Sequence, residues 1–499
     1  MSASSLPICK VGSIENVDAA SPSNSDEEGA PRLGGSREDE LDSFPMREEE
    51  TALPDRTPSP TASPIDAARG HPSLSAPASP PAPPAPIPNT PSKTVLVLSS
   101  SGKPVYCWPQ EIEGLPGVAA TAAGLLAFAG SRGEELRSIR SGRSTIVLLD
   151  RPPLALVAVS NQGEPAPVLR MQLSLLHAQL ESVLTRSALG VLFRKAPSYD
   201  LRRLLGGTEK MLDALVCSWA RSPAALLGAY PSLALPQPRR RVLATHLDIA
   251  LGSTRGHYAL LLGPAGVVAL AAAPGRPPLT QWEVLLLLNI VGVLGDEEAL
   301  TPVCLPHADP TALLHAYVRR LGGEGSTAGA SPGAGLGPLT LALLVPGAPD
   351  RASLAAAATR LAPIGHLAGA SPSLAVRDLP SSLGGGPPGT TPLLHYAYRL
   401  TGGAQFVASP PVGDGRLQQA IVLAYSQVRA AAYDRGSEAE GPLCGVRVER
   451  RPGLALAAVL GKEGELLAAY DALSTCEEVA AHCARLAAWL RAQHASWFS

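Results

Sequence analysis

Two glycine-rich stretches have the residue spacing of a chemical motif. The stretch GASPG at 329–333 fits the GxSxG pattern of a serine nucleophile, and GGGPPG at 384–389 fits the GxGxxG pattern of a dinucleotide-binding loop. A nucleophile elbow needs a strand before it and a helix after it, and a dinucleotide loop must open a helix. The first stretch lies in a Gly-, Ala- and Pro-rich insert, and the second contains two prolines. Both are therefore predicted to be linkers, and Ser331 is not expected to act as a nucleophile.

The histidines and cysteines form no recognisable metal-ligand pattern. HxxxH, HExxH and CxxC spacings are missing from the sequence, and His482 beside Cys483 has no second pair to match it. We interpret His482 as a helix-surface residue next to a buried thiol. An odd number of cysteines without paired spacing is typical of free thiols in a reducing compartment. The sequence thus predicts no metal, no cofactor and no covalent catalysis.

The charge of the chain is unevenly distributed. Residues 1–92 hold fourteen acidic and six basic side chains, whereas the rest of the chain is mildly basic. Basic residues gather at Arg202–Arg203 and at Arg239–Arg241, with few aromatic residues among them. Nucleic-acid binders interleave aromatic stacking platforms with basic residues, so nucleic acid is not an expected partner. The clusters are either solvated charge or contacts to phosphate-bearing lipid or an acidic partner.

Residues 1–92 are predicted to be a disordered tail. They are rich in Pro, Ser, Asp and Glu and cannot bury enough apolar surface to offset their ordering entropy. Several Ser-Pro and Thr-Pro pairs allow a second interpretation, a phosphorylation region that changes the local charge. No secretory signal is present at the N-terminus, and the apolar runs are too short or too interrupted to span a bilayer. These features predict a cytosolic protein.

The rest of the chain repeats one order of strands and helices three times. The first segment contains a predicted hairpin at 94–106, a helix at 117–130, strands at 144–150 and 153–160, and an amphipathic helix at 167–186. The second contains predicted strands at 242–251, 257–262, 266–273, 301–306 and 339–345, and a helix at 279–294 with Thr280 as its N-cap. The third contains a hairpin over 393–409, a helix at 416–433, strands at 444–450, 454–460 and 464–473, and a helix at 476–498.

This order predicts an α+β fold, in which helices pack on antiparallel sheets. We expect a first domain at 93–235, a second at 236–375 with a Gly-rich insert at 322–338, a Gly/Pro linker at 376–390 and a third domain at 391–499.

A double glycine interrupts an otherwise helical stretch, YDLRRLLGGTEKMLDALV at 199–216. We predict two helices with a tight corner. Asp200 would cap the first helix, with Leu201, Leu204 and Leu205 facing inward. Gly206 would take the left-handed position that ends this helix, and Thr208 would cap the second.

This stretch and several others resemble the SAND-type vacuolar fusion proteins of the Mon-one family. The similar segments run in order from about residue 94 to 498: VLVLSSSGKPVY, LRSIRSGRSTIVLLDRPPLALVAVS, YDLRRLLGGTEKMLDALV, LTPVCLPHADPTALLHAYV and the closing strand and helix. The resemblance implies three longin-like domains in one chain.

The resemblance also implies a function and partners. Family members pair with a Ccz-one-like longin protein, and the heterodimer is a guanine nucleotide exchange factor for a late-endosomal Rab GTPase of the Rab-seven type. It is recruited from the cytoplasm to endosome and vacuole membranes by phosphoinositide and an early-endosomal Rab. It acts in endosome maturation, vacuole and lysosome fusion and autophagy without covalent catalysis. The alternative is a longin scaffold that links membranes and tethering factors without exchange activity.

The resemblance further indicates which residues face a partner. The first domains of both subunits form the exchange platform, in which the hairpin turn Ser101–Tyr106 and the following helix matter most. We therefore expect Lys103, Pro104, Tyr106 and Trp108 near a partner, together with Arg202 and Arg203, and lipid contacts at Arg239, Arg240 and Arg241. The segment at 107–130 departs from the family pattern, because small residues stand where more charge is expected.

Overall fold

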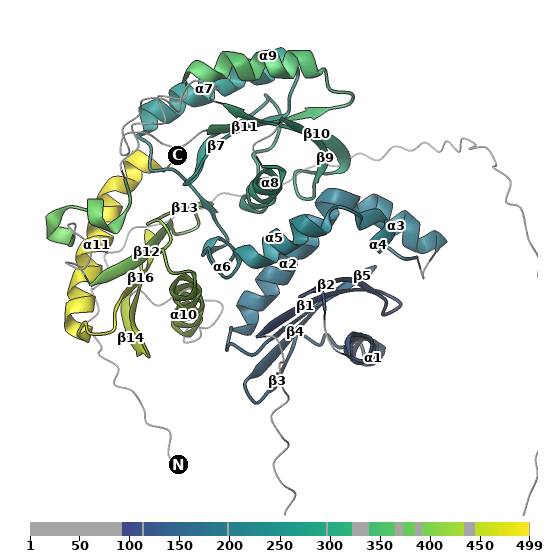
Figure 1. Ribbon diagram of the computed structural model, residues 1–499, viewed down its shortest axis with the longest axis horizontal. Helices are drawn as coiled ribbons and strands as arrows, with labels where there is room; N and C mark the ends of the chain where they lie inside the picture. Colours follow the sequence, from purple (N-terminus) through teal and green to yellow (C-terminus); the bar gives the residue numbers. More distant parts are fainter. Residues whose placement is uncertain are drawn as a thin grey trace, which may run out of the picture. The chain divides into compact units, whose positions relative to one another are not determined.

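The computed structural model describes most of the chain after residue 91 (Figure 1). The described residues are 92–111, 114–196, 199–295, 298–321, 339–364, 373–384, 392–433 and 445–498. They form three antiparallel sheets with packed helices, which confirms the predicted α+β class with three longin-like units. The tail at 1–91, the insert at 322–338 with Ser331, and most of the stretch at 384–389 lie outside the described residues.

The first sheet has helices on both faces. Its strand order is β2-β1-β5-β4-β3, formed by β1 (Lys93–Ser99), β2 (Pro104–Trp108), β3 (Ser138–Ser141), β4 (Ser144–Arg151) and β5 (Leu154–Ser160). Successive strand residues point to opposite faces, so Val95 and Val97 meet α2 (Ala166–Leu184), whereas Leu96 and Leu98 meet α1 (Leu115–Ser131). Figure 1 shows the two helices on opposite sides of the sheet. The predicted hairpins and both helices of this unit are confirmed.

The second sheet has the order β8-β7-β11-β10-β9. Its strands are β7 (Tyr258–Gly263), β8 (Gly266–Ala272), β9 (Ala299–Leu305), β10 (Asp309–Leu321) and β11 (Leu339–Pro346). The helices α7 (Gln237–Thr254) and α9 (Arg351–Leu361) pack side by side on one face, and α8 (Gln281–Leu294) covers the other (Figure 1). The Thr280 cap of α8 is confirmed, with Glu283 closing a capping box.

One predicted strand of this unit is wrong, and another strand was missed. Residues 242–251 belong to helix α7, because Leu243, Leu247 and Leu251 are spaced by one helical turn and are buried together against the sheet. A run of apolar residues does not by itself separate a strand from a buried helix. The long strand β10 has no counterpart among the predicted elements.

The third sheet has six strands in the order β14-β15-β16-β12-β13-β6. Five come from its own unit, namely β12 (Leu393–Leu400), β13 (Gln405–Ala408), β14 (Gly445–Arg451), β15 (Leu454–Leu460) and β16 (Gly464–Asp471). The helices α10 (Gly415–Tyr433) and α11 (Cys476–Trp497) bury opposite faces of this sheet. The predicted hairpin, strands and helices of the third unit are confirmed.

Two features of the third unit differ from expectation. Within the predicted linker, the described part contains two short 3-10 turns, Val376–Asp378 and Ser381–Leu383, and buries Leu379 and Leu383 in the third core.

His482 is buried, not on the surface: its Nδ1 lies 3.0 Å from the Tyr470 hydroxyl and its Nε2 lies 3.0 Å from the Leu383 carbonyl oxygen. The prediction was wrong because sequence spacing does not show that residues before the third sheet cover this helix.

The double glycine does separate two helices, but with different detail. The stretch contains α4 (Arg202–Leu205) and α5 (Glu209–Ser218), after α3 (Arg186–Lys195). The Asp200 carboxylate accepts a hydrogen bond from the Arg202 amide, but the N-cap residue of α4 is Leu201 and no side chain caps this helix, so the predicted Asp200 cap is wrong. Gly207, at φ 89°, takes the left-handed conformation, whereas Gly206 has φ −49°. Thr208 donates its hydroxyl to the Leu205 carbonyl and does not cap α5, and Leu204 is 47% exposed.

The segment at 221–235, which we call the connecting strap, joins the first unit to the other two. It contains α6 (Ala224–Leu227) and the two-residue strand β6 (Tyr230–Pro231), which pairs in parallel with β13 of the third sheet. Immediately after β6, Ser232 forms a bridge with Val267 of the second sheet. The strap thus has backbone pairing with two sheets at once.

Gly266 is needed where the strap crosses β8. A Cβ built on Gly266 would lie 2.3 Å from the Pro231 carbonyl oxygen, and the residue has φ 133°. We predict that Gly266→Ala lowers the free energy of unfolding by about 2 kcal/mol or more, measured by urea denaturation. Gly275→Ala, which also has a positive φ but open space around it, should cost less. Gly292→Ala in α8 should be neutral or stabilising, and equal losses in all three variants would contradict the steric argument.

His395 in β12 makes the third core sensitive to acid. Burial lowers the pKa of His395 from 6.5 to about 4. The unfolded chain binds this proton more readily than the folded chain. The contribution of neutral His395 to the free energy of unfolding is therefore fully present above pH 6.5. It is lost as the pH drops towards 4, by about 3 kcal/mol. Urea denaturation between pH 7 and pH 4 measures this slope. His395→Gln should flatten it, and an unchanged slope would contradict the assignment.

Candidate interaction site

Helix α1 of the first unit carries no charged residue in its seventeen positions. It begins after Gly114, which has φ 72°, and Pro116 lies in its first turn, where a missing amide hydrogen is tolerated. Ala119, Ala122 and Ala129 are its buried residues, and Ala119 and Ala122 share a core with Leu96 and Leu98 of the sheet. Small side chains on this stripe allow the helix to lie close to β1. Leu115 and Leu126 also pack against this core, whereas other large apolar side chains of α1 remain exposed.

Beside this buried stripe, α1 exposes a row of apolar side chains. Val118, Leu125 and Phe128 are 39%, 37% and 62% exposed, and their spacing places them on one side of the helix. The rest of the exposed surface of α1 is formed mainly by small residues, namely Gly117, Ala120, Thr121, Gly124 and Ala127. We call this surface the α1 face. Contiguous exposed apolar surface with few polar atoms typically marks a protein or membrane contact.

The β1–β2 turn lies against the same helix. A Cβ on Gly102 would be 3.1 Å from the Ala123 Cβ, so the turn contacts α1 closely. Lys103 of this turn is exposed and lies near Asp200. The Arg202 guanidinium binds both Asp200 carboxylate oxygens, at 3.0 and 2.9 Å. Hydrogen bonding from Arg202, with a smaller contribution from Lys103, holds the pKa of Asp200 at about 2. The structure thus brings together Lys103 and Arg202, two of the predicted partner residues.

Two other predicted partner residues, Tyr106 and Trp108, face the core instead. Tyr106 is 6% exposed, and its hydroxyl donates to the Asp213 carboxylate of α5 at 2.7 Å. Burial and this carboxylate raise the pKa of Tyr106 well above its usual range. Trp108 is half-buried and packs against the first core. These side chains attach α5 to the edge strand β2. Pro104, at the start of β2, is half-buried, and Arg203 is exposed on α4.

The three arginines predicted to bind lipid differ in their exposure to solvent. Arg239 and Arg241 are exposed at the start of α7, whereas Arg240 is 6% exposed. The Arg240 guanidinium donates to the carbonyl oxygens of Val268, Leu233 and Trp497, at 2.6, 2.7 and 2.8 Å. Arg240 is therefore not available to a lipid at the surface. Helical geometry turns adjacent residues by about 100°, which sequence proximity alone does not reveal.

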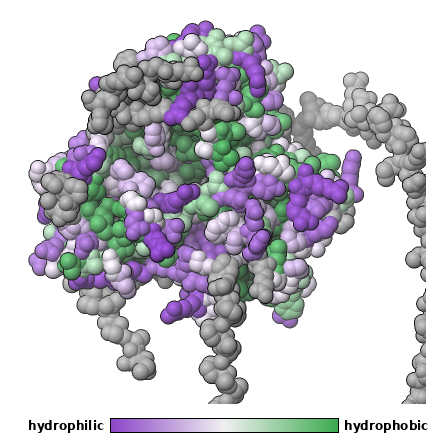
Figure 2. Space-filling view, in the orientation of Figure 1, coloured by the Kyte–Doolittle hydropathy of each residue, from purple (hydrophilic) through white to green (hydrophobic). Residues whose placement is uncertain are grey.

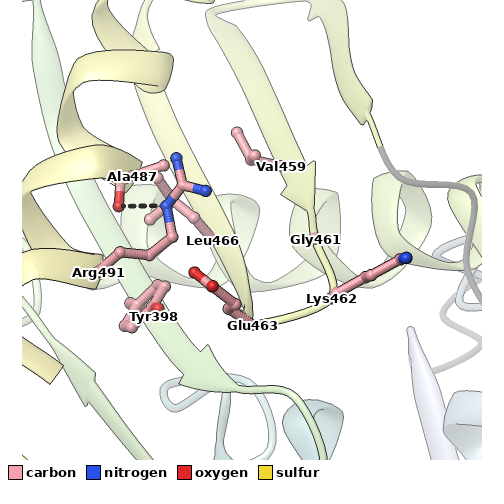
Figure 3. A pocket seen from close by; sticks show the side chains of 9 residues that line it. Tyr398, Val459, Gly461, Lys462, Glu463, Leu466, Ala487 and Arg491 are labelled. Atoms are coloured by element: carbon pink, nitrogen blue, oxygen red, sulfur yellow. Dashed lines mark hydrogen bonds between the residues drawn. The ribbon is translucent and has the colours of Figure 1, made fainter. Parts of the chain in front are cut away.

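A pocket of about 260 Å³ lies between the β15–β16 turn and α11 of the third unit (Figure 3). Arg491 and Glu463 lie at its opening with opposite charges, and the Arg491 Nε donates to the Ala487 carbonyl at 3.3 Å. Figure 3 shows the Lys462 side chain pointing away from it. Its lining contains no serine, cysteine or histidine, so it offers no nucleophile paired with a base.

Within the described ranges, no group of three or more His, Cys, Asp or Glu side chains could hold a metal ion. In the same part of the chain, no helix is both long and apolar enough to cross a membrane. The cysteines described here, at 107, 217, 304, 476 and 483, are free.

The first sheet, with α1 on one face and α2 on the other, defines a longin-type unit with an exposed apolar helix. Residues 93–215 match the family model for the first longin domain of FUZ, MON1 and HPS1. This part of the chain is therefore similar to the first longin domain of the MON1 proteins.

Curated relatives match less than half of the chain. It is 37% identical over 237 residues to human "Vacuolar fusion protein MON1 homolog B", covering 46% of this chain and 43% of that protein. It is 34% identical to the Arabidopsis thaliana "Vacuolar fusion protein MON1 homolog", covering 45% of this chain and 37% of that one. The solved structure "MglB with tetrameric arrangement" is 20% identical over 28% of this chain and 98% of its own, with a TM-score of 0.19, too low to show a shared fold.

Sequence reasoning did not name Val118, Leu125 or Phe128, the apolar residues of the α1 face. It placed weight on the turn and the following helix, and then selected Tyr106 and Trp108, which are aromatic but packed inside. The available signal was the complete lack of charge in α1, which is unusual for a helix with one solvent-facing side.

Tyr106 should act as a structural residue. We predict that Tyr106→Phe lowers the free energy of unfolding by about 1–2 kcal/mol, because the Asp213 carboxylate loses the shorter of its two side-chain donors among the described residues and keeps only the Gln110 amide. Urea denaturation measures the loss. Asp213→Asn, which removes the charge but keeps an acceptor, should cost less. A Tyr106→Phe variant of unchanged stability would show that this hydrogen bond is not needed.

Proposed function

We propose that this chain is a subunit of a heterodimeric guanine nucleotide exchange factor. Its substrate would be a late-endosomal or vacuolar GTPase of the Rab-seven type, and its partner a Ccz-one-like longin protein. The process served would be endosome maturation and vacuole or lysosome fusion. The curated relatives' names, which describe vacuolar fusion proteins, support this assignment, as does the match of residues 93–215 to a first longin domain.

The observation that carries the proposal is the α1 face. Its exposed Val118, Leu125 and Phe128 gain free energy when another apolar surface removes them from water, at about 25 cal/mol per Å². The flat stretch around Gly117 and Gly124 allows a second helix or sheet to approach closely. Lys103 and the Asp200–Arg202 pair border it with polar groups that can fix the orientation of a partner. A second longin chain is the occupant we propose.

Exchange requires binding energy and no covalent step. A GTPase holds its nucleotide through Mg²⁺ and through switch segments ordered by the phosphates. A protein that binds these segments in a different conformation lowers the affinity of the GTPase for Mg²⁺ and nucleotide. The reason is that the exchange factor and the nucleotide favour different conformations of the same segments. Two joined longin units provide a rigid surface for this purpose.

Recruitment from the cytoplasm to the membrane is part of the same proposal. Arg239 and Arg241 are exposed on α7, where they can contact phosphate groups of a phosphoinositide. Arg240 is excluded from this role by its burial. An early-endosomal Rab would supply the second contact to a peripherally bound complex.

A nucleotide-release assay tests the exchange activity. The late-endosomal Rab is loaded with fluorescent GDP, and this protein is added together with its longin partner. We expect release to accelerate with concentration of the complex. Unchanged release, combined with equal binding of the Rab in its GDP and GTP forms, would instead show a scaffold that links membranes and tethering factors.

The variant Phe128→Asp tests the role of the α1 face. Phe128 is 62% exposed, so the fold should be retained, whereas burial of a carboxylate should weaken partner association by about 30-fold or more. Ile249→Asp on α7 is a matched control at a similarly exposed helix position, 58% exposed. Titration of each variant with the longin partner gives the dissociation constants. Equal weakening by both variants, or by neither, would remove the α1 face from the interface.

A further inference from the structure

A cleft of about 450 Å³ lies where the second unit meets the third. Residues of α7 and β8 line one side, and the β12–β13 turn with Phe498 lines the other. Figure 2 shows a hollow with hydrophobic walls on this face, near the position of β13 in Figure 1. Volumes of this size are typical of small-molecule sites.

Arg240 contributes a buried positive charge to this cleft. Its hydrogen-bond acceptors are three backbone carbonyl oxygens, which are dipoles and do not neutralise the guanidinium. No carboxylate lies within ion-pair distance of it among the described residues, and its Nε has no hydrogen-bond partner there. Arg240 is 6% exposed, and this burial lowers the pKa of its guanidinium. A buried charge without a counter-ion is costly, so an anion beside it would be stabilised.

The other residues that line the cleft add positive charge at one end and apolar surface along the sides. Arg241 lines the same cleft from its exposed side, and the Tyr230 hydroxyl accepts a hydrogen bond from the Gln405 amide at 3.0 Å. None of the described lining residues is acidic. The walls are mostly apolar, with Leu270, Leu279, Leu400 and Phe498 among them. The cleft therefore combines a positive end with hydrophobic sides.

We propose that this cleft binds a single-chain amphipathic anion, a small molecule with an acidic head on a hydrocarbon body. The acidic head lies against Arg240 and Arg241, and the hydrocarbon body lies along Leu270, Leu279 and Phe498. A bare phosphate ion uses only the positive end, and a neutral alcohol of equal length uses only the walls. Tight binding thus requires a ligand with both an acidic head and a hydrocarbon body.

Dodecanoate is the probe, and isothermal titration calorimetry on the full chain is the measurement. We expect dodecanoate to bind at least about tenfold more tightly than dodecanol or inorganic phosphate. Equal affinity for dodecanoate and dodecanol, or no binding of dodecanoate at 1 mM (an order-of-magnitude limit for a specific site), would overturn the proposal.

Two arginine variants separate the cleft from general surface charge. Arg241→Gln should weaken dodecanoate binding by about tenfold, the effect of one lost charged contact. Arg239→Gln removes an equal charge two residues away, outside the lining, and should leave binding unchanged. Similar losses in both variants would indicate non-specific attraction and overturn the site. Arg240→Gln is less useful because it also removes the three carbonyl contacts. The α1 face takes no part in this cleft, so nucleotide release and dodecanoate binding fail or succeed independently.

Discussion

The arrangement of the three units depends on how the connecting strap satisfies its backbone carbonyl groups. Arg399 and Arg429 of the third unit donate to the carbonyl oxygens of Leu227 and Leu226, and Gln418 donates to that of Arg221. Arg240 of the second unit donates to that of Leu233. Buried carbonyl groups without donors would cost free energy, and charged donors form the stronger hydrogen bonds. The strap is therefore held by side chains from two units as well as by strand pairing.

This attachment determines which surfaces of the first unit are covered. Helix α2 packs on α6 and α8 as well as on its own sheet, and the first and second units share one continuous core. The inner layer of the first unit is thus buried within the chain. Helix α1 lies on the opposite face of the sheet (Figure 1), where its apolar side chains are left exposed. The exposed α1 face, the candidate interaction site, is therefore on the side of the first sheet that no other described unit covers.

Elements fixed by local chemistry were predictable from the sequence. The Ser-Gly turn predicts the β1–β2 hairpin, the leucine stripe predicts α2, and Thr280 with Glu283 three residues later predicts the start of α8. The errors occurred where distant residues decide. Residues 242–251 read equally as a strand or as a buried helix, and only contact with α9 and β8 favours the helix. His482 is buried because Leu383, far away in the sequence, covers it.

The sequence by itself determined the α+β class, the three repeated units and the resemblance to the MON1 family, because hydrophobic periodicity, turn residues and similar segments are local properties. The tertiary structure alone decided which candidate residues are accessible. Tyr106 and Arg240 are held inside by Asp213 and by three carbonyl oxygens, whereas Phe128 is left exposed. The physical reason is that burial depends on contacts between residues far apart in the chain, which composition and spacing do not specify.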